Sequence, residues 1–254
     1  MPDFICPVCH TELINLYCPK CEHRYYEEDG VTCLLPPKIN EYSSYYFEIQ
    51  RYNEIAKNGA EKYSGLEETR PFSRARLINE LLATYDIKEV LNIGIGFGFI
   101  EDALHYTIDK CTSYDPCIEF IKYVKERHPS DKHIYVNGIA EALPFPDNSI
   151  GCMVCDSTFQ SINNRMSFLY ELGRVTCDKA LILISIGYLW NYPRKPQDGF
   201  NIKNPEELKT LRRFLKEIGF EIQIRYRDSN EDAWVDKKSE GDYLWIIGKK
   251  ETLQ

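Results

Sequence analysis

The sequence predicts an α/β fold: a mostly parallel β-sheet with helices on both faces, preceded by a small metal-binding module. Three observations support this prediction. From residue 86 onwards, short apolar segments alternate with helical patterns, which is typical of β-α-β units. A glycine-rich turn follows the first apolar segment, and two Cys-x2-Cys pairs lie near the N-terminus. The length of 254 residues suits one large domain with a small appendage.

The first element contains two Cys-x2-Cys pairs, Cys6, Cys9, Cys18 and Cys21. Each pair makes a tight turn whose two thiolates converge, and two such turns supply the four ligands of a structural zinc ion. Residues 1–37 are too few to bury a core of their own, so metal binding would supply most of their folding free energy, on the order of 10 kcal/mol. His10 or His23 could replace one thiolate, and four reduced cysteines without metal are the other alternative.

The second element, residues 38–85, is expected to be helical and rich in aromatic residues. Tyr45, Ile49, Tyr52 and Ala56 recur at intervals that place them on one face of a helix. Such a face usually packs into a core. The alternative is that this segment caps a substrate site.

The third element, residues 86–254, begins with a buried strand at 88–93 and the turn Gly94-Ile95-Gly96-Phe97-Gly98. Glycine lets the backbone turn sharply and lets a ligand lie against bare backbone at a helix N-terminus. The next strand ends at Asp115, whose carboxylate can accept both ribose hydroxyls of an adenosine ligand. In a G-x-G-x-x-G dinucleotide motif the third glycine would fall at Phe99, so an NAD-dependent oxidoreductase is disfavoured.

This G-x-G-x-G turn resembles the first motif of class I S-adenosylmethionine-dependent methyltransferases. The stretch from Gly138 to Ile150 is similar to the segment that holds the adenine in that family, and residues 221–226 and 243–248 resemble its closing hairpin. The resemblance implies a Rossmann-like, seven-stranded sheet and S-adenosylmethionine as the cofactor. It also implies that eight residues contact this cofactor: Asn92, Gly94, Gly96, Gly98, Asp115, Pro116, Ala140 and Glu141.

Residues 4–37 resemble the zinc ribbons that are fused to the front of many methyltransferases. Similar ribbons partner tRNA-modifying methyltransferases as separate subunits, or precede the catalytic domain of some rRNA guanine methyltransferases. Two positions depart from the family pattern. Asn92 stands where an Asp or Glu is usual, and Ile139 replaces the Asp that receives the adenine amino group. A noncatalytic adaptor with a degenerate methyltransferase fold is therefore an alternative.

Three residues are candidates for contact with the reacting groups: Asp156, Gln160 and Tyr192. Methyl transfer from a sulfonium is an in-line displacement, so alignment and exclusion of water supply most of the catalysis. A general base helps only when the acceptor atom holds its proton at neutral pH. Each candidate also has a structural interpretation, such as a loop-capping carboxylate for Asp156.

A third Cys-x2-Cys pair, Cys152 and Cys155, falls on a predicted strand. Residues three apart on a strand face opposite sides, so their thiols cannot converge on one ion. We expect both to be buried thiols.

The composition bears on the acceptor and the compartment. The chain has 31 Lys and Arg against 39 Asp and Glu, a net charge of −8, which disfavours tight charge-driven binding to nucleic acid. No apolar run approaches the ~20 residues of a membrane helix, and no secretory signal is evident. We expect a cytoplasmic enzyme with a small-molecule acceptor. An RNA base or a protein is the alternative acceptor, and the oligomeric state is not predicted.

Overall fold

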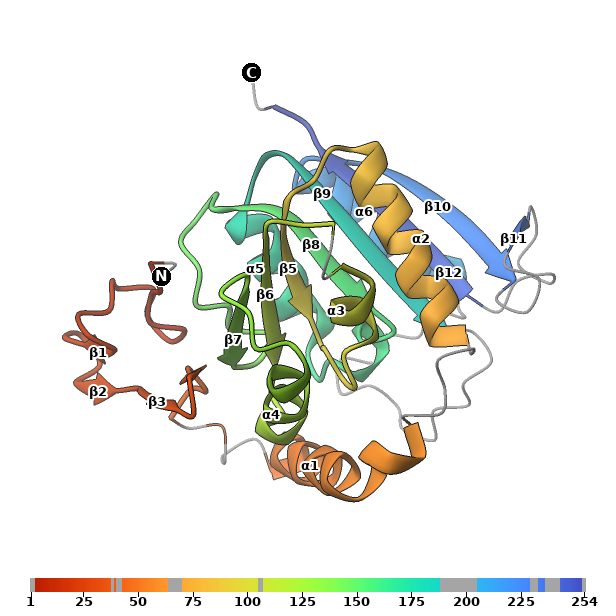
Figure 1. The fold of residues 1–254 in the computed structure, drawn as a ribbon. Coiled ribbons are helices and arrows are strands. Elements are labelled where there is room, and N and C mark those ends of the chain that lie inside the picture. Colours follow the sequence, from red (N-terminus) through yellow and green to blue (C-terminus); the bar gives the residue numbers. More distant parts are fainter. Residues whose placement is uncertain are drawn as a thin grey trace. The chain divides into compact units, whose positions relative to one another are not determined.

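The computed structural model describes residues 3–37, 39, 43–63, 70–104, 107–187, 205–228, 233–235 and 243–252. The chain divides into two compact units, Met1–Pro146 and Asp147–Gln254. Each unit combines strands and helices in alternation, as predicted (Figure 1). Among the described helices, none is both long and apolar enough to cross a membrane.

The sheet of the first unit has three parallel strands at its centre: β5 (Glu89–Ile93), β6 (Lys110–Asp115) and β7 (His133–Asn137). The N-terminal module extends this sheet, because β4 (Val31–Cys33) pairs in parallel with β7 and β3 (Tyr26–Glu28) pairs with β4. Two further strands of the module, β1 (Tyr17–Cys18) and β2 (His23–Arg24), form a separate ribbon.

The described residues of the first unit form four α-helices: α1 (Ser43–Tyr63), α2 (Arg70–Thr84), α3 (Phe99–Leu104) and α4 (Ile118–Arg127). Helix α4 packs on β6 and β7, and α1 lies beside α4 (Figure 1). Ile49 and Ala56 of α1 share a buried cluster with Phe120 of α4 and with Ile95 of the glycine turn. The predicted helical face therefore packs into the core, although the side chain of Tyr45 lies outside the described residues.

The sheet of the second unit contains the parallel pair β8 (Ile150–Asp156) and β9 (Thr176–Gly187). The antiparallel strand β12 (Tyr243–Lys250) pairs with β9, β10 (Phe220–Asp228) pairs with β12, and β11 (Ala233–Val235) pairs with β10. The predicted closing hairpin is thus confirmed. Three helical segments complete the unit: the 3-10 turn η2 (Phe159–Ser161), α5 (Arg165–Val175) and α6 (Pro205–Glu217).

The predicted number of seven strands is wrong. The seven strands expected from the family pattern all form, but β3 and β4 of the N-terminal module and the short β11 also join strands of the two units. These additional strands have only three residues each, too few to show a hydrophobic period in the sequence. The division of the chain at residues 37 and 85 stays a prediction.

Candidate functional site

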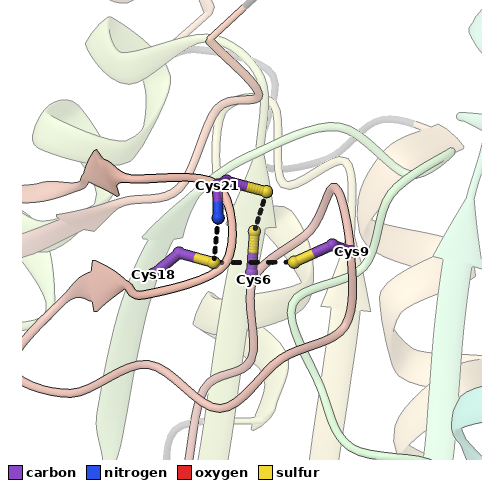
Figure 2. A group of neighbouring side chains, drawn as sticks. All are labelled: Cys6, Cys9, Cys18 and Cys21. Carbon is purple, nitrogen blue, oxygen red and sulfur yellow. Dashed lines mark hydrogen bonds between the residues drawn. The ribbon is translucent and has the colours of Figure 1, made fainter.

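The four N-terminal cysteines form one compact cluster (Figure 2). Their sulfur atoms all lie within 4.8 Å of one another. The distance is 3.9 Å between the sulfurs of Cys6 and Cys21, and 3.5 Å between those of Cys9 and Cys18. Tetrahedral zinc with Zn–S bonds of ~2.3 Å requires sulfur separations of about 3.8 Å. No histidine belongs to this cluster among the described residues.

Hydrogen bonds and burial shift the pKa values of three of these thiols. The hydrogen bond with Thr11 lowers the pKa of Cys9 to about 6. Hydrogen bonding with Cys9, together with burial, raises the pKa of Cys21 to about 12, and burial raises the pKa of Cys18. Four thiolates this close repel one another, so a cation is needed for all four to ionise together. The donor set and its geometry therefore fit a structural zinc ion.

The module that carries these cysteines contacts the rest of the first unit near both of its ends. The backbone N–H of Ile5, next to Cys6, donates to the carbonyl oxygen of Pro144 at 3.0 Å. The ring of Phe4 packs against that of Phe145, with centroids 5.9 Å apart. At the other end of the module, the N–H of Leu34 donates to the carbonyl oxygen of Asn137 at 2.8 Å. The module is thus anchored to β7 and to the segment that follows it.

The glycine turn joins β5 to α3 and has the open backbone that the sequence predicts. Gly94, Gly96 and Gly98 have φ angles of +78°, +50° and +83°, which L side chains rarely adopt. A Cβ atom on Gly98 would lie 2.8 Å from Val124 of α4, so this glycine permits close helix packing. A Cβ atom on Gly96 would meet no atom of the described residues within 4 Å, so with respect to these residues the backbone has open space beside it.

Asp115 lies at the end of β6, beside this turn. Its carboxylate accepts hydrogen bonds from the backbone N–H of Cys117 at 2.7 Å and of Gly96 at 3.4 Å. Burial raises the pKa of Asp115 to about 6, and the backbone donors partly oppose this shift. The side-chain amide of Asn137 donates to the carbonyl oxygens of Asp115 and Pro116, at 3.0 and 2.9 Å, and so fixes the chain after β6.

The segment that follows β7 is held against β6. The hydroxyl of Tyr114 donates to the carbonyl oxygen of Ile139 at 2.9 Å, and a Cβ atom on Gly138 would lie 2.2 Å from that hydroxyl oxygen. Ala140 is buried and Glu141 is half-buried. The side chain of Ile139 belongs to the buried cluster of α1 and α4. In the sequence, Ile139 stands at the position of the adenine-binding Asp that the family pattern has.

Asn92 is part of a buried polar cluster that sequence reasoning missed. Its side-chain amide donates to Oε1 of Glu101 at 2.9 Å, and the Ser113 hydroxyl donates to the same oxygen at 2.8 Å. All three side chains are fully buried, and burial raises the pKa of Glu101. The only signal in the sequence is that Glu101 lies between Ile100 and Leu104, at the buried positions of a short helix.

These observations decide whether S-adenosylmethionine fits the first unit. A ligand can lie against the backbone at Gly96, where a side chain would fill the space. Oδ2 of the neighbouring Asp115 carboxylate accepts a long hydrogen bond, 3.4 Å, from the N–H of Gly96, and a carboxylate oxygen has the lone pairs to accept a ribose hydroxyl as well. Pro116, Ala140 and Glu141 lie on segments tied to the same strand end. The donors and the space therefore fit the nucleoside part of this cofactor.

Two of the three candidate catalytic residues belong to the second unit: Asp156 ends β8 and Gln160 lies in the η2 turn. The Asp156 carboxylate accepts a hydrogen bond from the Ser185 hydroxyl. The side-chain amide of Gln160 donates to the carbonyl oxygen of Ser157 at 2.7 Å, and its Oε1 is buried with no hydrogen-bond partner among the described residues. The guanidinium of Arg165 donates to the carbonyl oxygens of Phe159 and Gln160, which fixes the η2 turn. Tyr192 lies outside the described residues.

Comparisons with known proteins bear on the fold. The chain matches the family described as a methyltransferase domain over residues 91–184. No curated protein matches the sequence significantly. A chain of the complex between the Haloferax volcanii Trm112 methyltransferase activator and a protein described as a methyltransferase has a TM-score of 0.57 and 15% identity, covering 79% of this chain and 98% of that one.

Two further solved structures are similar. A protein of Methanococcus maripaludis described as an S-adenosylmethionine-dependent methyltransferase has a TM-score of 0.57 and 18% identity, covering 80% of this chain and 94% of that one. An S-adenosylmethionine-dependent methyltransferase from Aquifex aeolicus has a TM-score of 0.52 and 18% identity, covering 80% and 98%. Residues 91–184 therefore match a methyltransferase domain, and the chain has the fold of the S-adenosylmethionine-dependent methyltransferases.

Proposed function

We propose that this protein transfers the methyl group of S-adenosylmethionine to an acceptor molecule. The observation that carries the proposal is the open backbone at Gly96 beside the carboxylate of Asp115. A bare backbone and an acceptor at the adjacent strand end are what an adenosine ligand requires. The proposed cofactor contacts are those that the sequence predicts, and the four N-terminal cysteines hold a structural zinc ion.

In this proposal the cofactor, when bound, supplies an electrophilic methyl group on its sulfonium sulfur. The residues of the chain orient the two reactants. Asp115 accepts hydrogen bonds from the ribose, and the turn at Gly96 places the methionine part. The unpartnered Oε1 of Gln160 supports a role for this residue as an acceptor toward the methyl-accepting molecule. Asp156 and Tyr192 remain the candidates for proton removal where the acceptor atom carries a proton.

We propose a small molecule as the acceptor, located in the cytoplasm. The net charge of −8 supports this choice over a nucleic acid. None of the ten cysteines, all of which are described, forms a disulfide, which supports a reducing compartment. An RNA base or a protein acceptor would be recognised by transfer of a tritiated methyl group into the RNA or protein fraction of a cell extract rather than into its small molecules.

The test is titration calorimetry of the zinc-loaded protein with S-adenosylhomocysteine, the demethylated product. We expect one molecule to bind per chain, and we expect Gly96→Val to abolish binding while the protein keeps its zinc. Absence of binding at millimolar ligand would contradict the proposal.

The second candidate is a noncatalytic adaptor, which Asn92 and Ile139 favour because neither supplies the usual carboxylate. Ile139 packs into the core and cannot accept a hydrogen bond from the adenine amino group. Glu141 and the backbone would have to accept it instead. Binding of S-adenosylhomocysteine without methyl transfer to any fraction of the extract would favour the adaptor. Transfer to any of them would exclude it.

A further inference from the structure

The zinc module contacts the first unit at the two segments that border the proposed nucleoside site. One contact runs through Leu34, whose N–H donates to the carbonyl oxygen of Asn137. The side chain of this same Asn137 donates to the carbonyl oxygens of Asp115 and Pro116. Asn137 is buried, with 2% of its surface exposed. Hydrogen bonds therefore hold both its backbone carbonyl oxygen and its side-chain amide in place. Asn137 therefore links the module to the backbone of Asp115 and Pro116.

The other contact runs through Phe4 and Ile5, which directly precede the zinc ligand Cys6 in the chain. Ile5 donates to the carbonyl oxygen of Pro144, and Phe4 packs on Phe145. The Phe145 ring also packs on that of Tyr114, with centroids 6.0 Å apart, and the Tyr114 hydroxyl holds the carbonyl oxygen of Ile139. This route ends at the segment proposed to contact the adenine.

A bound zinc ion would order the part of the module from which both of these contacts extend. The cysteine-containing half of the module has only the two-residue strands β1 and β2, so its conformation depends on the metal ligands. Cys6 places Phe4 and Ile5, and Cys18 and Cys21 place the chain that continues into β3 and β4. A ligand that orders one side of a contact lowers the cost of ordering the other side.

We propose that Asn137 and Phe4 are positioning residues for the nucleoside half of the cofactor site, and that zinc binding and nucleoside binding are positively coupled through them. This inference rests on the proposed function. The amino-acid half of the cofactor has no part in it, because both contacts end at residues 114–116 and 138–145.

The test uses the reciprocity of coupled binding: if zinc tightens nucleoside binding, the nucleoside tightens zinc binding by the same factor. Zinc affinity of the full chain is measured by competition with a chromophoric chelator, with and without saturating S-adenosylhomocysteine. We expect about tenfold tighter zinc binding with the ligand, a coupling of about 1.4 kcal/mol. We expect most of this effect to persist with 5′-methylthioadenosine, which has the nucleoside but lacks the amino-acid group.

Two variants break the two routes separately. Phe4→Leu and Asn137→Ala are each expected to reduce the coupling to threefold or less. The zinc affinity without ligand stays within about threefold of the wild-type value. Val8→Ala is the matched control in the module, because Val8 lies between two zinc ligands and is 52% exposed. It should leave the coupling unchanged.

The outcomes separate the inference from the proposed function. If the wild-type protein binds the ligand but its zinc affinity does not change, the coupling is absent and the inference is wrong. Full coupling in both variants, or coupling with S-adenosylhomocysteine but none with 5′-methylthioadenosine, also overturns it. Should the wild-type protein bind neither ligand, the proposed function itself fails, and this inference fails with it. If Asn137→Ala does not fold, Phe4→Leu alone still decides the result.

Discussion

The zinc module and the glycine-turn region both bury ionisable groups, but they accommodate these groups in different ways. In the module, four thiols lie within 4.8 Å of one another, and only a cation allows all of them to ionise. Beside the glycine turn, Asp115 accepts backbone hydrogen bonds, and the pKa of Glu101 is raised so that it retains its proton more readily. We therefore expect the module to need a metal ion to fold, whereas the region of the glycine turn is expected to form without a ligand.

The largest expected effect comes from removing one zinc ligand. Cys18 is fully buried, and Cys18→Ser should abolish stable zinc binding and unfold the cysteine-containing part of the module. The lost metal-binding free energy is on the order of 10 kcal/mol. The measurements are zinc content per chain and the rate of proteolytic cleavage within residues 3–37. The wild-type protein treated with a strong chelator should behave in the same way.

The matched control for this change is Cys155→Ala, which removes a cysteine of another Cys-x2-Cys pair. Cys155 is fully buried in β8, so we expect a modest loss of stability, about 1–2 kcal/mol, and one zinc ion per chain as before. Retention of wild-type zinc affinity by Cys18→Ser would contradict the assignment of the metal site.

The second prediction compares alanine substitutions at two glycines of the glycine turn, Gly98 and Gly96. Gly98→Ala combines an unfavourable φ of +83° with a 2.8 Å approach to Val124, so we expect a destabilisation of about 3 kcal/mol in urea unfolding. Gly96→Ala has the strained φ but no clash, so it should cost about 1 kcal/mol. The added methyl group of Gly96→Ala instead occupies the space proposed for the ligand, and S-adenosylhomocysteine should bind at least tenfold more weakly. Equal stability losses for the two variants would contradict this reading of the turn.

The two regions also differ in what the sequence could predict. Cys6 and Cys9 have the same spacing as Cys152 and Cys155, and the local backbone decides the outcome: a turn brings two thiols together, while a strand separates them. Both outcomes follow from sequence, because turn and strand are local features. The same holds for the glycine turn and for Asp115 at the end of β6.

Other features depend on packing between distant segments and could not be predicted. Glu101 is buried because α3 presents it to Asn92 and Ser113 on two neighbouring strands, and no local pattern specifies that contact. Asn137 likewise acts through partners that are far away in the chain. Strand β4 pairs with β7 through only two residue pairs, Thr32 with Val136 and Cys33 with Asn137. A three-residue strand is too short for its sequence to predict this pairing.

The third prediction concerns the pH dependence of cofactor binding. With a pKa of about 6, Asp115 is protonated in much of the free protein at pH 5 and is ionised at pH 7. Ribose hydroxyls donate to the ionised form and so favour it. We expect S-adenosylhomocysteine to bind about tenfold more tightly at pH 7 than at pH 5, by calorimetry with zinc content checked at both values. Asp115→Asn should bind more weakly and without this dependence.

The same pKa shift affects stability with a defined sign. The pKa of Asp115 is raised from 3.8 to about 6 in the folded protein, so the folded state binds the proton more tightly than the unfolded state. Stability is therefore highest below pH 4 with respect to this group, and it falls as the pH rises to about 6, by about 3 kcal/mol in total. Relative to wild type, Asp115→Asn should gain stability across this range. An unchanged difference between the two proteins would contradict the burial of a charged Asp115.

The smallest expected effect is that of Glu101→Gln, and it tests the contrast between the two regions directly. The pKa of Glu101 is raised by burial, so a neutral amide is a close substitute for the protonated acid. Near pH 5 the free energy of unfolding should change by less than about 1 kcal/mol. Because the folded pKa is raised, wild-type stability falls as the pH rises through it, whereas that of the variant does not. Urea unfolding between pH 5 and pH 8 should show the difference shifting in favour of the glutamine. A large, pH-independent loss would mean that the cluster needs a charge, as the zinc module does, and the contrast between the two regions would disappear.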